Sequence, residues 1–301
     1  MPLLSTTAQE LSRETLERGV IEEIITRDDM FAMLPFMQVN GKAYVYDREN
    51  TLASADFLSP NDTVNESASD VTQVTSYLKI LVGDVDVDKF LSTTMSDTNN
   101  QVAVQIAAKA KAVKRIFQAT VASGDTATNP KQFDGIARLC DPSQLITAGA
   151  NGAAIALSML DELRDQVILG PDAFIMRRGT WRAIKQLLRA AGGTRADMLE
   201  MENFGWPVPA FDGVPVLLND FIPDTETTGT NNSTTSIYAA RFNEADGLHG
   251  IFGGPNAGLI VEDIGTVQNK DANRIRVKWY AGLVLKSTLS LARLQGVNSN
   301  G

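Results

Sequence analysis

One long amphipathic helix, predicted from Thr98 to Gly124, restricts the fold more than any other segment of the sequence. Apolar residues recur at helical spacing along one face of it, namely Val102, Ile106, Ala110, Val113 and Phe117. Asn99 or Asn100 can cap its start, and Gly124 can close its end. About 24 residues rising about 1.5 Å each give a rod of roughly 36 Å, which is long for a helix of a globular protein.

The opposite face of this helix is basic. Lys111, Lys114 and Arg115 cluster there, and the stretch holds four basic residues and no acidic one. Such a face can be solvated, can touch nucleic acid weakly, or can receive an acidic segment of a neighbouring chain. The sequence leaves all three interpretations open.

A second constraint is a pair of alternating segments that reads as a long hairpin. Residues 42–49 and 71–82 both alternate between apolar and polar side chains, as strands do. The stretch between them is polar and rich in turn residues, and it is long for a hairpin connection. Because a two-stranded hairpin is marginal by itself in water, it must lie on its own core or on another subunit.

The N-terminal segment, residues 5–26, reads as an amphipathic helix with a narrow apolar stripe that includes Leu11, Leu16 and Val20. It has no obvious local partner. A helix docked on its own domain and an arm reaching to another subunit are both open.

The charge is unevenly distributed along the 301 residues. Residues 1–98 hold 7 basic and 17 acidic side chains, a net charge of -10, although the whole chain has a net charge of only -9. Overall acidity argues against a protein whose main task is gripping nucleic acid, since phosphate contacts need clustered Lys and Arg. The asymmetry indicates that the first third meets something more basic than itself.

The second half reads as α+β. Helical patterns span residues 153–168 and 177–193, on either side of a short buried strand at 172–176. Strands are predicted in four further stretches, at 208–223, 236–242, 258–264 and 274–294. We expect these strands to form mixed sheets around two or three helices.

No catalytic constellation emerges from the sequence. It has no nucleophile elbow, no Walker A loop, no paired-histidine zinc motif and no CxxC. The single histidine, His249, lies in a turn-like stretch and is expected to be structural. The single cysteine, Cys140, excludes an internal disulfide and is expected to be a small buried residue. We therefore expect neither enzyme activity nor a cofactor or metal site.

Three alternating acids, Asp84, Asp86 and Asp88, could suggest calcium. A calcium loop also needs a glycine at the bend and a distal bidentate glutamate. Val85 and Val87 between the acids instead favour a strand with one solvated face. No segment approaches the roughly 20 apolar residues of a membrane-spanning helix, and the N-terminus does not read as a secretory signal.

The order of these elements resembles the tailed-bacteriophage major capsid protein family, with its Hong-Kong-type fold. QVAVQIAAKAKAVKRIFQATVASG followed by FDGI resembles the spine helix of that family and the strand after it. DAFIMRRGTWRAIKQL resembles the strand and helix of its axial domain, and FDGVPVLLNDFIP a further axial strand. The stretches SIYAARFNEADGLHGIFG, GLIVEDI and RIRVKWYAGLVLKSTLSLARL resemble its ending. Each piece is degenerate, but the ordered set covers nearly the whole chain.

The resemblance implies an α+β fold with an N-terminal arm, an extended β-hairpin loop, a peripheral domain with the spine helix and an α/β axial domain. The expected division is 1–40 for the arm, 41–90 for the extended loop, 91–150 for the peripheral domain, 151–257 for the axial domain and 258–301 for closing strands that return to the peripheral domain. Contacts between subunits are expected at Leu11, Leu16, Val20, Lys111, Lys114, Arg115, Arg177 and Arg178.

The implied function is a major capsid protein that self-assembles as hexamers and pentamers into an icosahedral shell around the double-stranded DNA of a tailed phage. The implied partners are further copies of the chain, with scaffolding, portal and decoration proteins, weak interior contacts to DNA and no membrane. The implied location is the virion, with assembly in the host cytoplasm. The alternatives are an encapsulin-type bacterial nanocompartment, which shares the fold, and, from another class, a soluble α/β enzyme.

Overall fold

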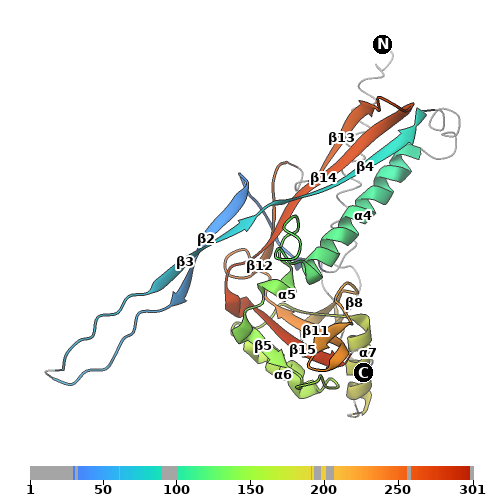
Figure 1. Ribbon diagram of the computed structural model, residues 1–301. Coiled ribbons are helices and arrows are strands. Elements are labelled where there is room, and N and C mark those ends of the chain that lie inside the picture. The colour runs from blue at the N-terminus through green and yellow to red at the C-terminus, as the bar shows by residue number, and fades with distance from the viewer. Residues whose placement is uncertain are drawn as a thin grey trace.

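The structure is a computed structural model that describes residues 30, 33–60, 62–89, 101–190, 192, 198–200, 207–255 and 259–298. These residues form three parts, which Figure 1 shows from one side. A long hairpin projects from the middle of the molecule. An elongated region holds a narrow sheet with a long helix beside it, and a compact region holds a wider sheet covered by shorter helices.

The hairpin consists of β2 (Ala43–Thr51) and β3 (Asp70–Tyr77), which pair antiparallel as a separate two-stranded sheet. Residues 52–60 and 62–69 lie between them without helix or strand. The predicted hairpin is confirmed, but the second segment is shorter than expected. The chain leaves the hairpin at Leu78, whose backbone N–H donates a hydrogen bond to the Lys42 carbonyl. It then enters a different sheet as β4. The predicted strand at 71–82 is therefore two strands.

The elongated sheet has the order β1, β12, β14, β13, with β4 paired to β14 on its other side. The strands are β1 (Phe36–Gln38), β4 (Lys79–Asp88), β12 (Leu248–Phe252), β13 (Leu259–Thr266) and β14 (Ala272–Leu285). β14 is long enough to pair with β12 at one end and with β13 and β4 along the rest. Its length gives this part of the molecule its elongated shape (Figure 1).

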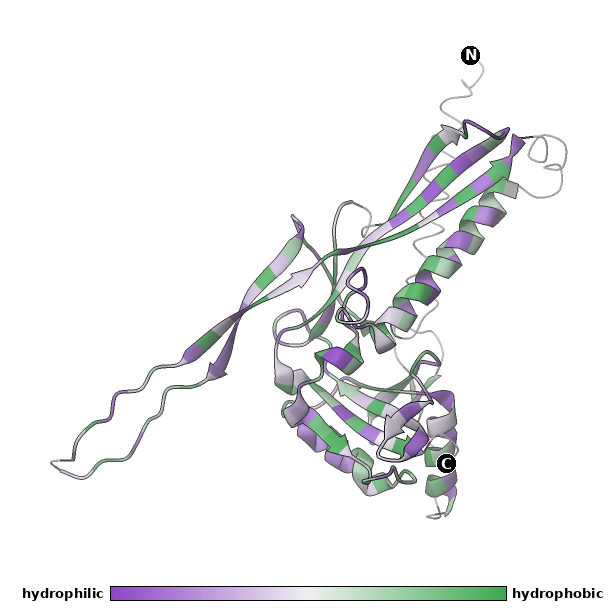
Figure 2. Cartoon of the chain, viewed as in Figure 1, coloured by the Kyte–Doolittle hydropathy of each residue, from purple (hydrophilic) through white to green (hydrophobic). Residues whose placement is uncertain are grey.

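The long helix is α4 (Gln101–Ser123), and it ends where Gly124 donates to the Thr120 carbonyl. It packs on one face of the elongated sheet because both elements are amphipathic, as the alternating colours of β4 and β14 in Figure 2 show. Phe117 of α4 is fully buried at the centre of this contact. Its ring centroid lies 4.5 Å from that of Trp279 on β14 and 5.2 Å from that of Phe133.

The compact sheet has the order β5, β15, β11, β6, β9, β8, β7, with β10 paired to β11. The strands are β5 (Leu145–Thr147), β6 (Ala173–Met176), β7 (Met198–Glu200), β8 (Pro207–Phe211), β9 (Val214–Leu218), β10 (Glu226–Thr228), β11 (Asn231–Ala240) and β15 (Leu291–Asn298). The predicted short strand at 172–176 and the strand at 236–242 are both confirmed. The stretch 208–223 forms a hairpin of β8 and β9, with Asp212 and Gly213 at positive φ in its turn.

Helices cover the compact sheet on both faces. The helical segments here are α5 (Ile136–Leu139), α6 (Leu157–Gln166), α7 (Arg178–Ala190), and the 3-10 turns η1 (Pro142–Gln144) and η3 (Thr288–Ser290). Alternation along β11 separates the two faces. Ile237 and Ala239 join the core under α6 and α7, whereas Tyr238 and Ala240 join the core shared with α4. The two helices predicted at 153–168 and 177–193 are thus confirmed, on one face of one sheet.

Several expectations about the chain's organisation differ from the structure. The end of the expected arm, 1–40, belongs to the body, because Met30 and Leu34 are buried and β1 pairs with β12. β12, expected in the axial range, lies in the elongated sheet, and β5, expected in the peripheral range, lies in the compact one. The stretch FDGI, expected to enter a strand, leads into the short helix α5, whose turn closes on Gly135. β4 belongs to the elongated sheet rather than to the extended loop, because it pairs with β14 along its whole length. β15 does not return to the elongated sheet with β13 and β14; it pairs with β11 and β5 in the compact one.

Candidate intersubunit surfaces

The tip of the hairpin exposes large apolar side chains. Phe57 is fully exposed, and three more apolar residues of the tip are exposed, namely Leu52, Leu58 and Val64. Single exposed apolar residues are normal on a protein surface, but several on one projecting segment indicate a contact site. The tip was expected to be polar, and most of its residues are, but the exposed apolar side chains among them were not singled out. The apolar residues scattered among its turn residues were the signal that could have found this surface.

The base of the hairpin is fixed to the body, so its direction is set by the fold. The Tyr46 hydroxyl donates to the Leu285 carbonyl at 2.7 Å. The Arg48 guanidinium donates to the same carbonyl at 2.7 Å and to the Lys286 carbonyl at 2.8 Å. Burial raises the pKa of Tyr46, although the nearby Arg48 opposes that shift. These bonds hold the middle of β2 against the end of β14 and leave the far end of the hairpin projecting (Figure 1).

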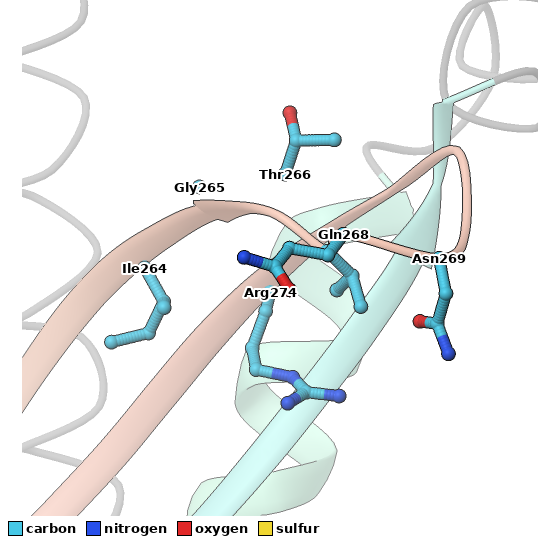
Figure 3. A pocket seen from close by; sticks show the side chains of 7 residues that line it. Ile264, Gly265, Thr266, Gln268, Asn269 and Arg274 are labelled. Atoms are coloured by element: carbon cyan, nitrogen blue, oxygen red, sulfur yellow. The ribbon is translucent and has the colours of Figure 1, made fainter.

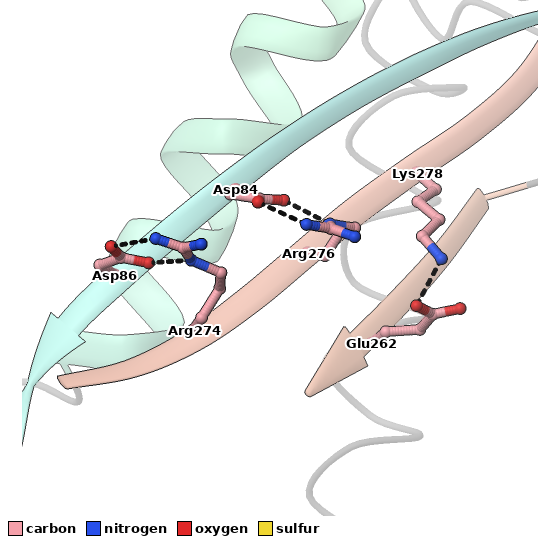
Figure 4. Close-up of polar contacts among 6 residues, drawn as sticks. All are labelled: Asp84, Asp86, Glu262, Arg274, Arg276 and Lys278. Atoms are coloured by element: carbon pink, nitrogen blue, oxygen red, sulfur yellow. Dashed lines mark hydrogen bonds and ion pairs between the residues drawn. The ribbon is translucent and has the colours of Figure 1, made fainter. Parts of the chain in front are cut away.

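The face of the elongated sheet that points away from α4 carries a row of ion pairs across its strands (Figure 4). Arg274 binds both carboxylate oxygens of Asp86, at 2.6 and 2.8 Å, and Arg276 binds those of Asp84 at the same two distances. These hydrogen bonds hold the pKa of Asp84 and of Asp86 below its usual value. Lys278 completes the row with Glu262 at 2.5 Å.

This row confirms the interpretation of the alternating acids as one face of a strand. Val85 and Val87 point the other way and are buried, on the side where β4 contacts α4. Ile80 and Val82 extend the same outer face toward the hairpin and are exposed. The six charged side chains of the row are already paired with one another. What this face of the sheet leaves exposed beside the row is therefore the apolar area of Ile80 and Val82.

Two of the predicted cations of α4, Lys111 and Arg115, lie away from the side occupied by Phe117, whereas Lys114, three residues before Phe117, lies beside that side. Lys111 and Arg115 are exposed, and Lys114 is partly buried. The Arg115 guanidinium carbon lies 5.8 Å from the centroid of the Phe221 ring, in a cation–π contact. We refer to these three residues below as the spine-helix cations. Their assignment to an intersubunit contact stays a prediction.

Two other predicted contact residues already have partners within the chain. Arg177 pairs with Asp224 at 3.0 Å and donates to the Ile222 carbonyl, and Arg178 pairs with Asp220 at 2.8 Å. Both acids lie in the segment that follows β9, so these ion pairs tie the start of α7 to that segment. The arm residues Leu11, Leu16 and Val20 lie outside the described residues.

Sequence reasoning missed most of the cations further along α7. Arg182, Lys185 and Arg189 follow Arg178 at spacings of four, three and four residues, which places them on one side of the helix. The regular spacing was visible in the sequence, but the acids that neutralise Arg177 and Arg178 were not, because they come from a segment more than 40 residues away.

The described part of the chain assembles no reactive site. Within it, no three His, Cys, Asp or Glu side chains gather as a metal site would require, and no helix is long and apolar enough to cross a membrane. Burial raises the pKa of the Cys140 thiol to about 11, which keeps it protonated at neutral pH. A shallow pocket at the far end of β13 is lined by Gln268, Asn269 and Arg274 (Figure 3), but the arginine is occupied by Asp86.

His249 was expected in a turn and lies instead in the middle of β12, fully buried. Its Nδ1 lies 3.3 Å from the Gly247 carbonyl oxygen, and its ring meets that of Tyr44 edge-on at 6.1 Å. Nε2 has no hydrogen-bond partner in the described part of the chain. Burial lowers the pKa of this histidine. The residue is structural, at the place where β12 meets the base of the hairpin.

The molecule has three parts: a projecting hairpin, an elongated sheet with a long helix, and a compact sheet with helices on both faces. The candidate contact sites described above lie on the exposed surfaces of these parts and not in a cleft. A family model described as the phage capsid family matches residues 10–247 of the sequence. This chain belongs to the phage capsid family. No curated protein gives a significant match to the sequence.

Solved structures show that the chain has the phage capsid fold. The SrpI encapsulin of Synechococcus elongatus, solved as the holo complex, is similar with a TM-score of 0.73 and 21% identity, over 92% of this chain and 90% of that one. The capsid of cyanophage A-1(L) gives a TM-score of 0.65 and 11% identity, over 91% and 93%. The capsid-family fold also matches Mycobacterium phage Bobi, with a TM-score of 0.63, 11% identity and 89% of each chain covered.

At these identities the likeness establishes the fold, and the family match establishes the general role. The chain is a shell-forming structural protein of phage type. The expected tailed-phage capsid fold, with its α+β composition, is confirmed.

Proposed function

We propose that the chain is the major capsid protein of a tailed phage, whose hexamers and pentamers close into an icosahedral head around double-stranded DNA. The observation that carries this proposal is the family match over residues 10–247 in a chain whose hairpin projects with a fully exposed Phe57. A monomer has no use for such a hairpin. In a shell, each stable contact between subunits buries about 1,200–2,000 Å².

In this proposal the described regions take the roles that the family resemblance implies. The hairpin, β2 and β3 with their tip, is the extended loop that lies across a neighbour. The elongated region with α4 is the peripheral domain, and the compact region with α6 and α7 is the axial domain around five-fold and six-fold centres. The N-terminal residues ahead of Met30 form an arm that contacts another subunit, whereas β1 belongs to the elongated sheet. The protein has no catalytic step, and its mechanism is association.

Charge is proposed to orient neighbouring subunits. Residues 43–77 carry six acidic side chains and one basic one. The spine-helix cations of an adjacent copy offer the complementary charge. Each exposed pair contributes only about 0.2–1 kcal/mol, but the contact repeats around the shell. The subunit assembles in the host cytoplasm and ends in the virion, with scaffolding, portal and decoration proteins as further partners and DNA touched weakly inside.

The second candidate is an encapsulin-type compartment. It is favoured by one observation: the SrpI encapsulin has a higher TM-score and a higher identity to this chain than either phage capsid named above. The two functions differ in what the shell contains.

The experiment is to purify particles from cells that produce the protein naturally, treat them with nuclease, image them in negative stain and analyse their contents. Closed shells that hold nuclease-resistant DNA support the phage head. Shells that hold a second folded protein and no DNA support the encapsulin. Protein that stays monomeric at every concentration and salt tested would overturn both.

A further inference from the structure

The two helices on the outer face of the compact sheet carry opposite charges. The exposed side of α6 bears three acids, Asp161, Glu162 and Asp165. The corresponding side of α7 has only cations, and the helix contains no acidic residue at all. Both helices pack on the same apolar core, so their charged sides both face away from the sheet.

Three charges on each of these two helices have no partner among the residues that the structure describes. In the part of the chain that the structure describes, the side chains of Arg182, Lys185 and Arg189 form no hydrogen bond or ion pair. This contrasts with Arg178 at the start of the same helix, which is held by Asp220. Asp161, Glu162 and Asp165 of α6 likewise have no ion pair among the described residues. Arg164, which lies between them in the sequence, forms an ion pair with Asp212. These six side chains therefore form two defined surfaces of unmatched charge, one of each sign.

An exposed apolar pair adjoins the acidic surface. Ile168 and Leu169, just beyond the end of α6, are 68% and 66% exposed. They are the large apolar side chains with the most exposed area outside the hairpin and β4 in the described part of the chain. Apolar residues bordered by charge are the usual composition of a protein interface.

The two surfaces lie toward opposite edges of the compact sheet, on the same face of it. In Figure 1, α6 lies on the side of β5 and β15, and α7 lies on the other side of the sheet's width. Identical subunits in a ring meet through two different surfaces, one from each neighbour, and such head-to-tail contacts close into a ring when the rotation allows it. A subunit with an acidic surface on one side and a basic surface on the other has the arrangement that such a ring requires.

We propose that α7 of one subunit docks on α6 of the next, with Arg182, Lys185 and Arg189 facing Asp161, Glu162 and Asp165 around each ring of the shell. This inference rests on the proposed function, because it presumes rings of identical subunits. It adds the surfaces that join neighbours within a ring, which are distinct from the hairpin contact. The occupant is a second copy, because a nucleic acid on α7 would leave the acids of α6 unexplained, and one partner chain accounts for both.

The test exchanges the charges. One variant carries Arg182→Glu, Lys185→Glu and Arg189→Glu, and a second carries Asp161→Lys, Glu162→Lys and Asp165→Lys. A third combines all six substitutions. We expect each triple variant alone to raise the concentration needed for assembly by about tenfold or more. The combined variant restores assembly, because acid again faces base.

A mixture of the two triple variants gives a sharper result. In equal amounts they can alternate around a ring, so that every contact joins opposite charges. Alternation closes in a ring of six and not in a ring of five. The mixture should therefore yield six-membered rings, sheets or tubes in the microscope, without closed icosahedral shells.

Matched controls separate folding from contact. Neutral variants, with Arg182→Gln, Lys185→Gln and Arg189→Gln, should weaken assembly less than the reversed set, and all variants should melt close to the unmodified protein. Assembly of either triple variant at the normal concentration overturns the inference. So does failure to assemble of the variant that carries all six substitutions, provided that it is folded. Failure of the unmodified protein to form rings or shells would instead overturn the proposed function and this inference with it, whereas normal shells of the unmodified protein beside normal shells of a triple variant would overturn the inference alone.

Discussion

The exposed Phe57 at the hairpin tip allows the proposed contact with a neighbour to be tested at one residue. The change is Phe57→Ser. In the isolated subunit the ring is already fully exposed and packs on nothing. Removing it should change the free energy of unfolding of the monomer by no more than about 0.5 kcal/mol, which is the range for surface substitutions.

In the assembled shell the expected cost is larger. Burying one phenylalanine side chain contributes about 1.5–3 kcal/mol. Since about 1.4 kcal/mol is a factor of ten in an equilibrium constant, loss of the ring should weaken each tip contact roughly 10- to 160-fold. Every subunit donates one tip, so the concentration at which shells appear should rise by a similar factor.

The assay is light scattering against subunit concentration, with sedimentation velocity to separate shells from free subunits. Thr63→Ala is the matched control, because it changes another exposed position of the same tip without removing apolar area. If Phe57→Ser assembles at the same concentration as the unmodified protein, the tip does not bury this ring in a neighbour. If it lowers the melting temperature of the free subunit by several degrees, the ring has a role within the chain and the reasoning is wrong.

Three further predictions concern charge, packing and pH. Reversal of the spine-helix cations to Glu should block shell assembly with little change in melting, whereas normal empty shells from this variant would favour contact of those cations with DNA. Phe117→Ala should lower the free energy of unfolding by about 3–5 kcal/mol, because the side chain is fully buried among aromatic rings; Ile116→Ala, at a position that is 51% exposed, is the control in the same denaturant titration. His249 has a pKa lowered by burial, so the unfolded chain takes up a proton that the folded chain refuses. Stability of the free subunit should therefore fall as the pH drops below about 6.5, and His249→Gln should flatten that part of the curve; an unchanged slope would contradict this origin.

Periodicity alone located the elements whose side chains follow a regular pattern. The α4 helix was visible because its apolar residues recur at helical spacing over the whole of its length, and the two hairpin strands because they alternate. The helices α6 and α7 were predicted from their helical patterns, and β6 between them from a short apolar run. The regular pattern of Asp84, Asp86 and the valines around them was enough to distinguish a strand face from a calcium loop.

The order of these elements also pointed to the family, which the family match and the solved structures confirm. No single motif could do this, because the surfaces of a shell subunit require no fixed catalytic residues. The distinction between phage head and encapsulin lies in the contents of the shell, and nothing in the local pattern of the chain encodes it.

Only the tertiary structure showed which strands and which charged side chains pair when they lie far apart in the sequence. The sequence could not show that β15 joins β11 instead of following β14, since both strands alternate in the same way. Nor could it show that Asp220 and Asp224 neutralise Arg178 and Arg177, while the cations further along α7 find no partner in the described part of the chain. A charge in the sequence has only a sign, and whether it is available to a neighbour depends on which distant segment the fold brings beside it. Local spacing therefore determined the elements of this protein, whereas the long-range packing of its chain determined which of its surfaces are left for other subunits.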